Sequence, residues 1–359
     1  MITVNFFHRI KNYNLLLAGL LFFANILKAE SINDNAIMSD NFPKMLSEYN
    51  FFKDPIAQVP TNKVIPYQLM TELFSDYTKK KRFLYVPNNK KAVFEEDSVY
   101  QFPLGTALIK TFYYNDDERK ANPVPNLLET RVLLKRKSGW KAASYVWDME
   151  KKDAELKIAG KTIYTSWINS DGDEKSVRYR VPNVNQCQEC HESNKKVIPI
   201  GPKARNLNFN IYYSDIEKEL NQLQYWFQMG LIDYPSVIDK SAVDWTDHNQ
   251  SLDRRARSYL DINCGHCHSE SGNAASSGLY LNLKETRDRH IGVYKKPVAA
   301  GRGSGGKLYS IVPGKPEDSI LLFRMKSKDP GIMMPESGRA LNHDEGINLI
   351  HDWINNMSH

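Results

Sequence analysis

The chain has 359 residues, of which 41% are hydrophobic and 25% are charged, and this composition is typical of a folded protein rather than a disordered one. Lysine and arginine exceed aspartate and glutamate by six, but half of this excess comes from Arg9, Lys11 and Lys28. The rest of the chain therefore carries only a weak positive charge, and the sequence gives no support to nucleic-acid binding.

The first 29 residues have the pattern of an export signal. Two basic residues precede an apolar run over 15–27, which is short for a membrane span, and Ala29 offers a small residue for cleavage. We predict a cleaved signal peptide over 1–29, a periplasmic mature chain and no membrane attachment after cleavage. An uncleaved anchor is the alternative.

The next part of the chain predicts an irregular arm followed by a β-rich domain. Residues 30–65 are polar and rich in proline, so we expect a loosely held arm. The apolar spacing in 66–77 predicts a helix. Short runs rich in β-branched and aromatic residues, separated by turn residues, then predict strands in an antiparallel sandwich or barrel that completes the domain 66–182. These runs are 82–86, 98–102, 107–114, 127–135, 145–147, 155–158, 162–167 and 177–181.

One basic run, Lys79-Lys80-Lys81-Arg82, interrupts this pattern. A run of like charges usually forms a solvated face, and we expect that here. The alternative is a docking patch for an acidic redox partner.

All four cysteines occur in two Cys-x-x-Cys-His motifs, which end at His191 and His268. This spacing is typical of c-type haem attachment, because one helical turn presents both thiols to a porphyrin edge and the next residue lies under the iron. We predict that Cys187, Cys190, Cys264 and Cys267 attach two haem c groups covalently and that His191 and His268 are the proximal iron ligands. Zinc and a disulfide are the alternatives.

The region after the first motif reads as mainly helical. Capping residues and apolar spacing predict helices over 215–228, 252–261 and 316–325, and a last helix that begins near Asn342. We divide this part into a first haem-binding region, 183–247, and a cytochrome c domain, 248–359. The predicted fold class is therefore multi-domain α+β.

Met334, followed by a proline and then by the closing helix, is the predicted distal ligand of the second iron. Met333 and Met325 are the competing candidates. The first iron has no evident distal ligand, and Met149, Met229, His248 and His290 are its candidates. Lys203 and Arg205 follow the first motif in a rigid basic segment, and we expect one of them to pair with a haem propionate.

The whole pattern resembles a family of bacterial dihaem c-type cytochromes with an N-terminal β domain, over about residues 66–359. The similar segments are FPLGTALIKTFYY, LLETRVLLKRKSGW, YRVPNVNQCQECH, IPIGPKARNLN and RRARSYLDINCGHCH. The resemblance implies two covalent haems, periplasmic electron transfer and an unidentified redox partner protein. A dihaem peroxidase or oxidase with an open first haem is the alternative, and then the protein would be an enzyme.

Overall fold

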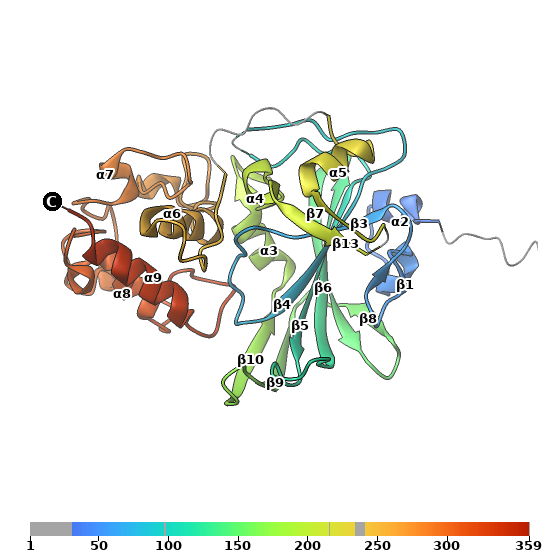
Figure 1. Cartoon of the computed structure of the whole chain (residues 1–359), viewed down its shortest axis with the longest axis horizontal. Helices are drawn as coiled ribbons and strands as arrows, with labels where there is room; N and C mark the ends of the chain where they lie inside the picture. The colour runs from blue at the N-terminus through green and yellow to red at the C-terminus, as the bar shows by residue number, and fades with distance from the viewer. Residues whose placement is uncertain (1–30, 97, 215, 234–240, 359) are drawn as a thin grey trace, which may run out of the picture.

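The computed structural model describes residues 31–96, 98–214, 216–233 and 241–358, so the predicted signal peptide lies outside the described residues. The protein has an α+β architecture in which strands form one large sheet and helices α6 to α9 gather on one side of it (Figure 1). No helix in the described ranges is long and apolar enough to span a bilayer.

The centre of the β domain is a six-stranded antiparallel sheet whose strands are neighbours in chain order. They are β3 (Val64–Tyr67), β4 (Lys79–Tyr85), β5 (Ala107–Asn115), β6 (Pro125–Arg136), β7 (Gly139–Asp148) and β8 (Asp153–Leu156). The hairpin of β9 (Lys161–Ile168) and β10 (Glu174–Val181) packs against one end of the sheet. The described chain thus contains one large sheet and four two-stranded sheets, in place of the two large sheets of the expected sandwich. The predicted strand over 98–102 is wrong, because Val99 and Gln101 make only isolated bridges.

The N-terminal segment covers one face of this sheet, so the prediction of a loose arm is wrong. It contains α2 (Asp34–Met38), a 3₁₀ turn η1 (Leu46–Tyr49), β1 (Phe52–Asp54) and β2 (Val59–Pro60). Ile37, Leu46, Tyr49 and Phe51 are no more than 2% exposed and share a core with the sheet. A few apolar residues among polar ones are enough to hold this segment in place, because the sheet supplies the rest of the core.

The first-motif region covers the opposite face, so residues 183–247 do not form a core of their own. Its elements are α3 (Val184–His191), β11 (Glu192–Ser193), β12 (Lys196–Val197), α4 (Ala204–Leu207), β13 (Asn210–Tyr213), β14 (Lys218–Asn221) and α5 (Gln222–Gln228). Leu207 and Trp226 pack with Leu84, Leu108 and Leu133 of the sheet. The first motif is therefore fixed to the β domain.

Two predicted helices are wrong for identifiable reasons. Residues 66–77 begin in the edge strand β3, where a proline is tolerated, and then form an irregular connection. The helix expected over 215–228 is replaced by β14 up to Asn221, which caps the shorter α5 by accepting from Leu223 N and Gln224 N. Glu217 has a φ of 51°, which a helix does not allow, and Asp215 lies outside the described residues.

The basic run at 79–82 is a strand and not a solvated face. Because side chains alternate along β4, Lys80 and Arg82 point into the interior and are only 5% and 4% exposed. Lys79 points outward and pairs with Glu118 at 3.0 Å. The run therefore places two cations inside the protein.

The helical part has a core cluster of its own. Its helices are α6 (Leu252–Asn263), α7 (Asp288–Ile291), α8 (Ile320–Lys326) and α9 (Asp344–Asn355), with 3₁₀ turns η2 (Ala275–Ser277), η3 (Gly301–Ser304) and η4 (Pro316–Asp318). Ala256 and Leu260 of α6 pack with Ile350, Trp353 and Ile354 of α9. The helices predicted near 252, 316 and 342 are thus confirmed.

The connection between β3 and β4 joins the two parts. Phe74 N donates to Asn263 Oδ1 at 2.8 Å, and the Asp76 carboxylate accepts from Ala340 N and Leu341 N at 2.7 and 2.8 Å. Thr71 Oγ1 donates to Val243 O at 2.6 Å. The backbone N–H groups of Met70, Thr71 and Phe74 donate to Asn206 and Asn263, so they are not available for pairing within a helix over 66–77.

Candidate haem attachment sites

The first motif lies at the end of α3. Asn183 caps this helix by accepting from Gln186 N at 2.9 Å, and the Gln186 side chain accepts from Asn183 N. The helical spacing puts Cys187 and Cys190 on one face, one turn apart. Both are free thiols; Cys187 is buried and Cys190 is partly exposed. The arrangement meets the requirement for two thioether bonds to one porphyrin edge.

The imidazole of His191 is held in the state that an iron ligand needs. Its Nδ1 lies 2.8 Å from the backbone oxygen of Ile198, which the short hairpin β11–β12 brings back beside α3. A carbonyl only accepts, so Nδ1 carries the proton and Nε2 keeps its lone pair. Burial lowers the pKa of His191 to about 4, and the ring is therefore neutral at physiological pH.

The second motif follows directly after α6. Backbone hydrogen bonds from Cys267 N and His268 N to Cys264 O, at 3.1 and 2.9 Å, close a tight turn. A Cβ at position 265 would lie 2.7 Å from Asp261 O, so only glycine fits there. Burial lowers the pKa of His268 to about 4, and its Nδ1 lies 3.4 Å from Ser277 Oγ. This histidine is also neutral.

The thiols do not have the properties of a redox pair. Burial raises the pKa of both Cys264 and Cys267 to about 12, whereas a catalytic Cys-x-x-Cys pair needs a lowered pKa. The four thiols are free, and within the described ranges no three His, Cys, Asp or Glu side chains are grouped as metal ligands. The geometry thus gives no support to the disulfide and zinc alternatives.

Met334 lies in the loop between α8 and α9, and this loop passes beside the second motif. The backbone fixes its position, since Met334 N donates to Arg324 O and Arg339 Nη2 donates to Met334 O, both at 3.0 Å. Met325 and Met333 are 8% and 9% exposed and occupy packed positions. Glu336 lies close enough to raise the pKa of Cys267. Met334 as the distal ligand of the second iron stays a prediction.

The two motifs are neighbours in space. Ser193 Oγ, in the hairpin after the first motif, donates to Ser271 Oγ at 2.9 Å, and Asn194 N donates to Ser271 O at 2.9 Å. Cys190 Sγ lies 3.4 Å from Ser337 Oγ, in the loop that also carries Met334. Groups attached at the two motifs would therefore be adjacent.

A cleft of about 510 Å³ lies between the motifs and is lined by Cys190, His191 and Lys203 on one side and by Gly265 and His266 on the other. This volume is typical of a site for a small ligand or cofactor. The His266 Nδ1 atom is buried and makes no hydrogen bond to any described residue. Sequence reasoning missed His266 because it treated the two residues inside each motif as spacers.

Arg205 also lines the cleft, but much of its guanidinium is already bound. Its Nε and Nη2 donate to the two carboxylate oxygens of Asp261 at 3.0 and 2.8 Å, and both side chains are 3% exposed. Burial alone would raise the pKa of Asp261, but the positive charges of Lys203 and Arg205 lower it to about 2. The predicted propionate contact of Lys203 or Arg205 stays a prediction, and Lys203 has the freer position in the cleft.

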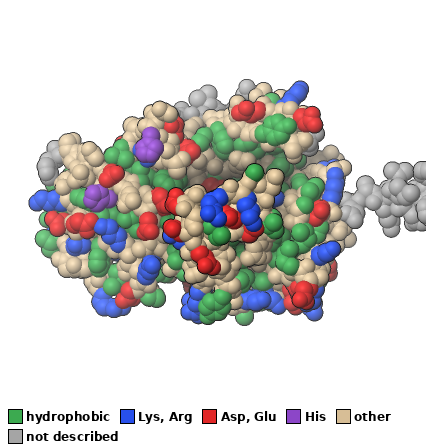
Figure 2. Space-filling model, turned by 60° about the horizontal axis from the view of Figure 1, so that its bottom comes forward, with side chains coloured by type: hydrophobic (Ala, Val, Ile, Leu, Met, Phe, Trp, Pro, Cys, Tyr) green, Lys and Arg blue, Asp and Glu red, His purple; other side chains and the backbone are tan. Residues whose placement is uncertain are grey.

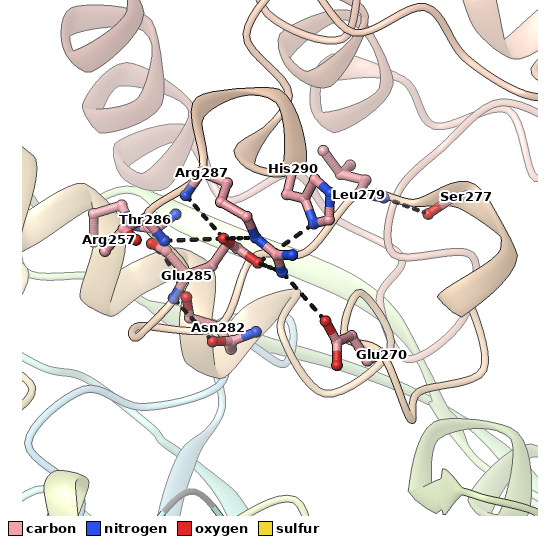
Figure 3. A network of polar contacts seen from close by, with 9 residues as sticks. All are labelled: Arg257, Glu270, Ser277, Leu279, Asn282, Glu285, Thr286, Arg287 and His290. Carbon is pink, nitrogen blue, oxygen red and sulfur yellow. Dashed lines mark hydrogen bonds and ion pairs between the residues drawn. The ribbon is translucent and has the colours of Figure 1, made fainter.

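The four candidates for the distal position of the first iron have other surroundings. His290 Nδ1 lies 3.6 Å from Glu285 Oε2, in a polar network with Arg287 and Glu270 that is shown in Figure 3. His248 contacts Arg255 at 3.2 Å. Met149 and Met229 are each 47% exposed. His266 lines the cleft with His191, whereas none of these four residues does.

Comparisons with protein-family models, curated proteins and solved structures found no match.

Replacing Asp261 by alanine will destabilise the junction between the two parts, because Arg205 and Lys203 lose their buried counter-charge. We expect a loss of about 3–5 kcal/mol in the free energy of unfolding, measured by urea denaturation. Glu317→Ala, which removes an exposed ion pair to Lys326, is the matched control and should cost at most about 1 kcal/mol. Equal losses in the two variants would contradict this assignment.

The same carboxylate predicts a pH dependence. The pKa of Asp261 is lowered by folding, so its contribution to stability is complete above its unfolded value of about 4 and is lost as the pH falls through about 2. The Asp261→Ala variant should therefore lose less stability than the wild type between about pH 4 and about pH 2. An identical dependence of stability on acid pH in the two proteins would contradict this role of Asp261.

Proposed function

We propose that this protein is an exported dihaem c-type cytochrome that transfers electrons through two covalently attached haems. The observation that carries the proposal is the state of His191: a neutral, partly buried imidazole whose Nδ1 is bound to Ile198 O, one residue after two thiols spaced by one helical turn. Disulfide exchange requires no such histidine, and no three His, Cys, Asp or Glu side chains of the described residues are grouped as a zinc site would need.

The residues present fit haem at both motifs. Four thiols would hold the two groups covalently, His191 and His268 would provide proximal nitrogens, and Met334 would provide the distal sulfur at the second site. When bound, haem supplies iron that changes its oxidation state by one electron, and a thioether ligand raises its potential relative to histidine. The protein supplies fixed ligands and a partly dry environment around each motif.

Electron transfer is supported further by the joining of the two motifs. The hydrogen bonds of Ser193 and Asn194 to Ser271 hold the two attachment segments side by side, so electrons could pass between neighbouring groups without a large movement of the chain. A periplasmic partner protein would then exchange electrons with either group. On the face drawn in Figure 2, acidic and basic side chains are intermingled, which gives no preference for a partner of one charge there.

A second candidate function is that of a peroxidase or oxidase. The observation that favours it is the cleft beside His191, where His266 and Lys203 would stand near an open position of the first iron. A small ligand could reach the iron by this cleft, and a neutral histidine could accept a proton from it.

The holoprotein should contain two haems per chain, measured by the pyridine haemochrome assay against protein concentration. Replacing Cys187 and Cys190 by alanine should leave one haem, because only the second motif then retains its thiols. The matched pair Cys264→Ala with Cys267→Ala should also leave one. A wild-type protein that carries zinc and no haem would refute the proposed function.

Met334→Ala should change the second iron alone from low spin to high spin, because its distal sulfur is lost. Absorption and electron paramagnetic resonance spectra of the oxidised protein measure this change. Met229→Ala is the control, since that side chain is exposed on the surface. Unchanged spectra in Met334→Ala would show that another group is the ligand.

Cyanide and peroxide separate the two candidate functions. If the protein is an electron carrier with both irons six-coordinate, neither reagent should alter its spectrum at millimolar concentration. A saturable cyanide shift that disappears when the first motif is removed, together with turnover of peroxide, would establish the enzyme instead.

A further inference from the structure

Three cations form a row across the middle of the large sheet. Arg82 of β4 is the register partner of Lys110 in β5, and Lys110 is the register partner of Arg131 in β6. Register partners in an antiparallel sheet point to the same face and have Cβ atoms about 5 Å apart, and like charges in such pairs are destabilising. The row therefore needs compensation.

The protein supplies only part of this compensation. Arg82 Nη1 pairs with Glu72 at 2.6 Å, Lys80 lies 3.6 Å from the same carboxylate, and Arg131 binds Glu129. These two carboxylates are thus the ion-pair partners of three cations, and Lys110 is a fourth cation beside them. No carboxylate among the described residues is within ion-pair distance of Lys110, whose Nζ lies 4.8 Å from the centre of the Phe112 ring. When Lys110 is protonated, the four cations of the cluster exceed its two carboxylates by two.

The surroundings of Lys110 disfavour a charged ammonium unless an anion is present. Burial, together with the charges of Arg131 and Arg82, holds the pKa of Lys110 well below its usual range. A lysine in a sheet interior that lacks a counter-charge is unfavourable, and an apolar residue would pack there at less cost. A bound anion would remove this conflict, because it would favour the charged form.

The excess charge lies on the face of the sheet that the first motif covers. Helix α3 packs against β7 on this face. The charges of Lys110 and Arg131 are close enough to help lower the pKa of His191, and those of Arg131 and Glu129 act on the Cys187 thiol. The uncompensated cations are therefore next to the residues that would hold the first haem.

We propose that Lys110, flanked by Arg82 and Arg131, binds the propionate carboxylates of the first haem. This inference rests on the proposed function. Two propionates carry two negative charges, which equals the excess of the cluster. Charge-assisted hydrogen bonds from an ammonium and two guanidinium groups are strong partners for carboxylates. The β domain is then part of the first haem site and not merely a scaffold or a docking surface.

The test is Lys110→Met, with Lys110→Arg as the conservative variant and the exposed Lys141→Met of β7 as the control. Haem content is measured first, and then the midpoint potentials of both haems in a spectroelectrochemical titration. Removing a cation favours the oxidised iron, so the first haem's potential should fall while the second stays unchanged. We expect a roughly tenfold change in the ratio of oxidised to reduced haem, about 59 mV for one electron.

Lys110→Arg and Lys141→Met should keep the wild-type potentials. If Lys110→Met folds, as judged by circular dichroism, but lacks the first haem while Lys110→Arg retains it, the proposal is also supported. Two haems with unchanged potentials in Lys110→Met would overturn the inference and leave the proposed function intact. Absence of haem from the wild type would overturn the proposed function itself.

A free anion is the other source of a carboxylate at this position. Acetate is the probe: it is titrated into the wild-type holoprotein at constant ionic strength. If propionates occupy the row, the first haem's potential should not respond. A saturable response that Lys110→Met abolishes would show that the row binds a dissociable anion, and the assignment to propionates would then be wrong.

Discussion

The six-stranded sheet has two faces that must both be covered, and the rest of the structure depends on how this is done. One face is apolar and is covered by the N-terminal segment, in which Tyr49 and Phe51 are almost completely buried. The other face has apolar ends and a charged middle formed by Arg82, Lys110 and Arg131. The segment that covers it carries the first Cys-x-x-Cys-His motif. A charged sheet interior and a candidate prosthetic-group site therefore occur together.

Backbone groups, more than side chains, set the geometry at both motifs. The carbonyl of Ile198 selects the tautomer of His191, and the carbonyl of Cys264 closes the turn that carries His268. Each of these hydrogen bonds joins residues that are close in the sequence and are held rigidly. Such bonds can orient a histidine ring before any metal is present. The hairpin β11–β12 has a double role, because it supplies Ile198 O on one side and contacts Ser271 on the other.

Features decided by local sequence were predictable, and features decided by distant contacts were not. The strand at 107–114 and the helix at 252–261 follow from apolar spacing and capping, and the structure has both. The segment over 66–77 has helical spacing, but its backbone N–H groups donate to Asn206, Gln222 and Asn263, which lie far away in the chain. The sequence predicts that Lys80 is exposed, because it lies in a basic run. In the structure Lys80 points into the interior, because side chains alternate along β4. His266 lies inside the second Cys-x-x-Cys-His motif, where the sequence marks it only as a spacer. Its position in the cleft depends on the fold and could not be predicted.

The Asp76 carboxylate has a consequence for any attempt to divide the protein. It belongs to the β domain, yet it accepts hydrogen bonds from Ala340 N and Leu341 N, beside the Arg339 side chain that binds Met334 O. A fragment beginning near residue 248 would retain the helical core but lose this anchor of the methionine loop. The boundary between the two parts thus separates two cores, but the position of the methionine loop in the second part depends on a carboxylate of the first.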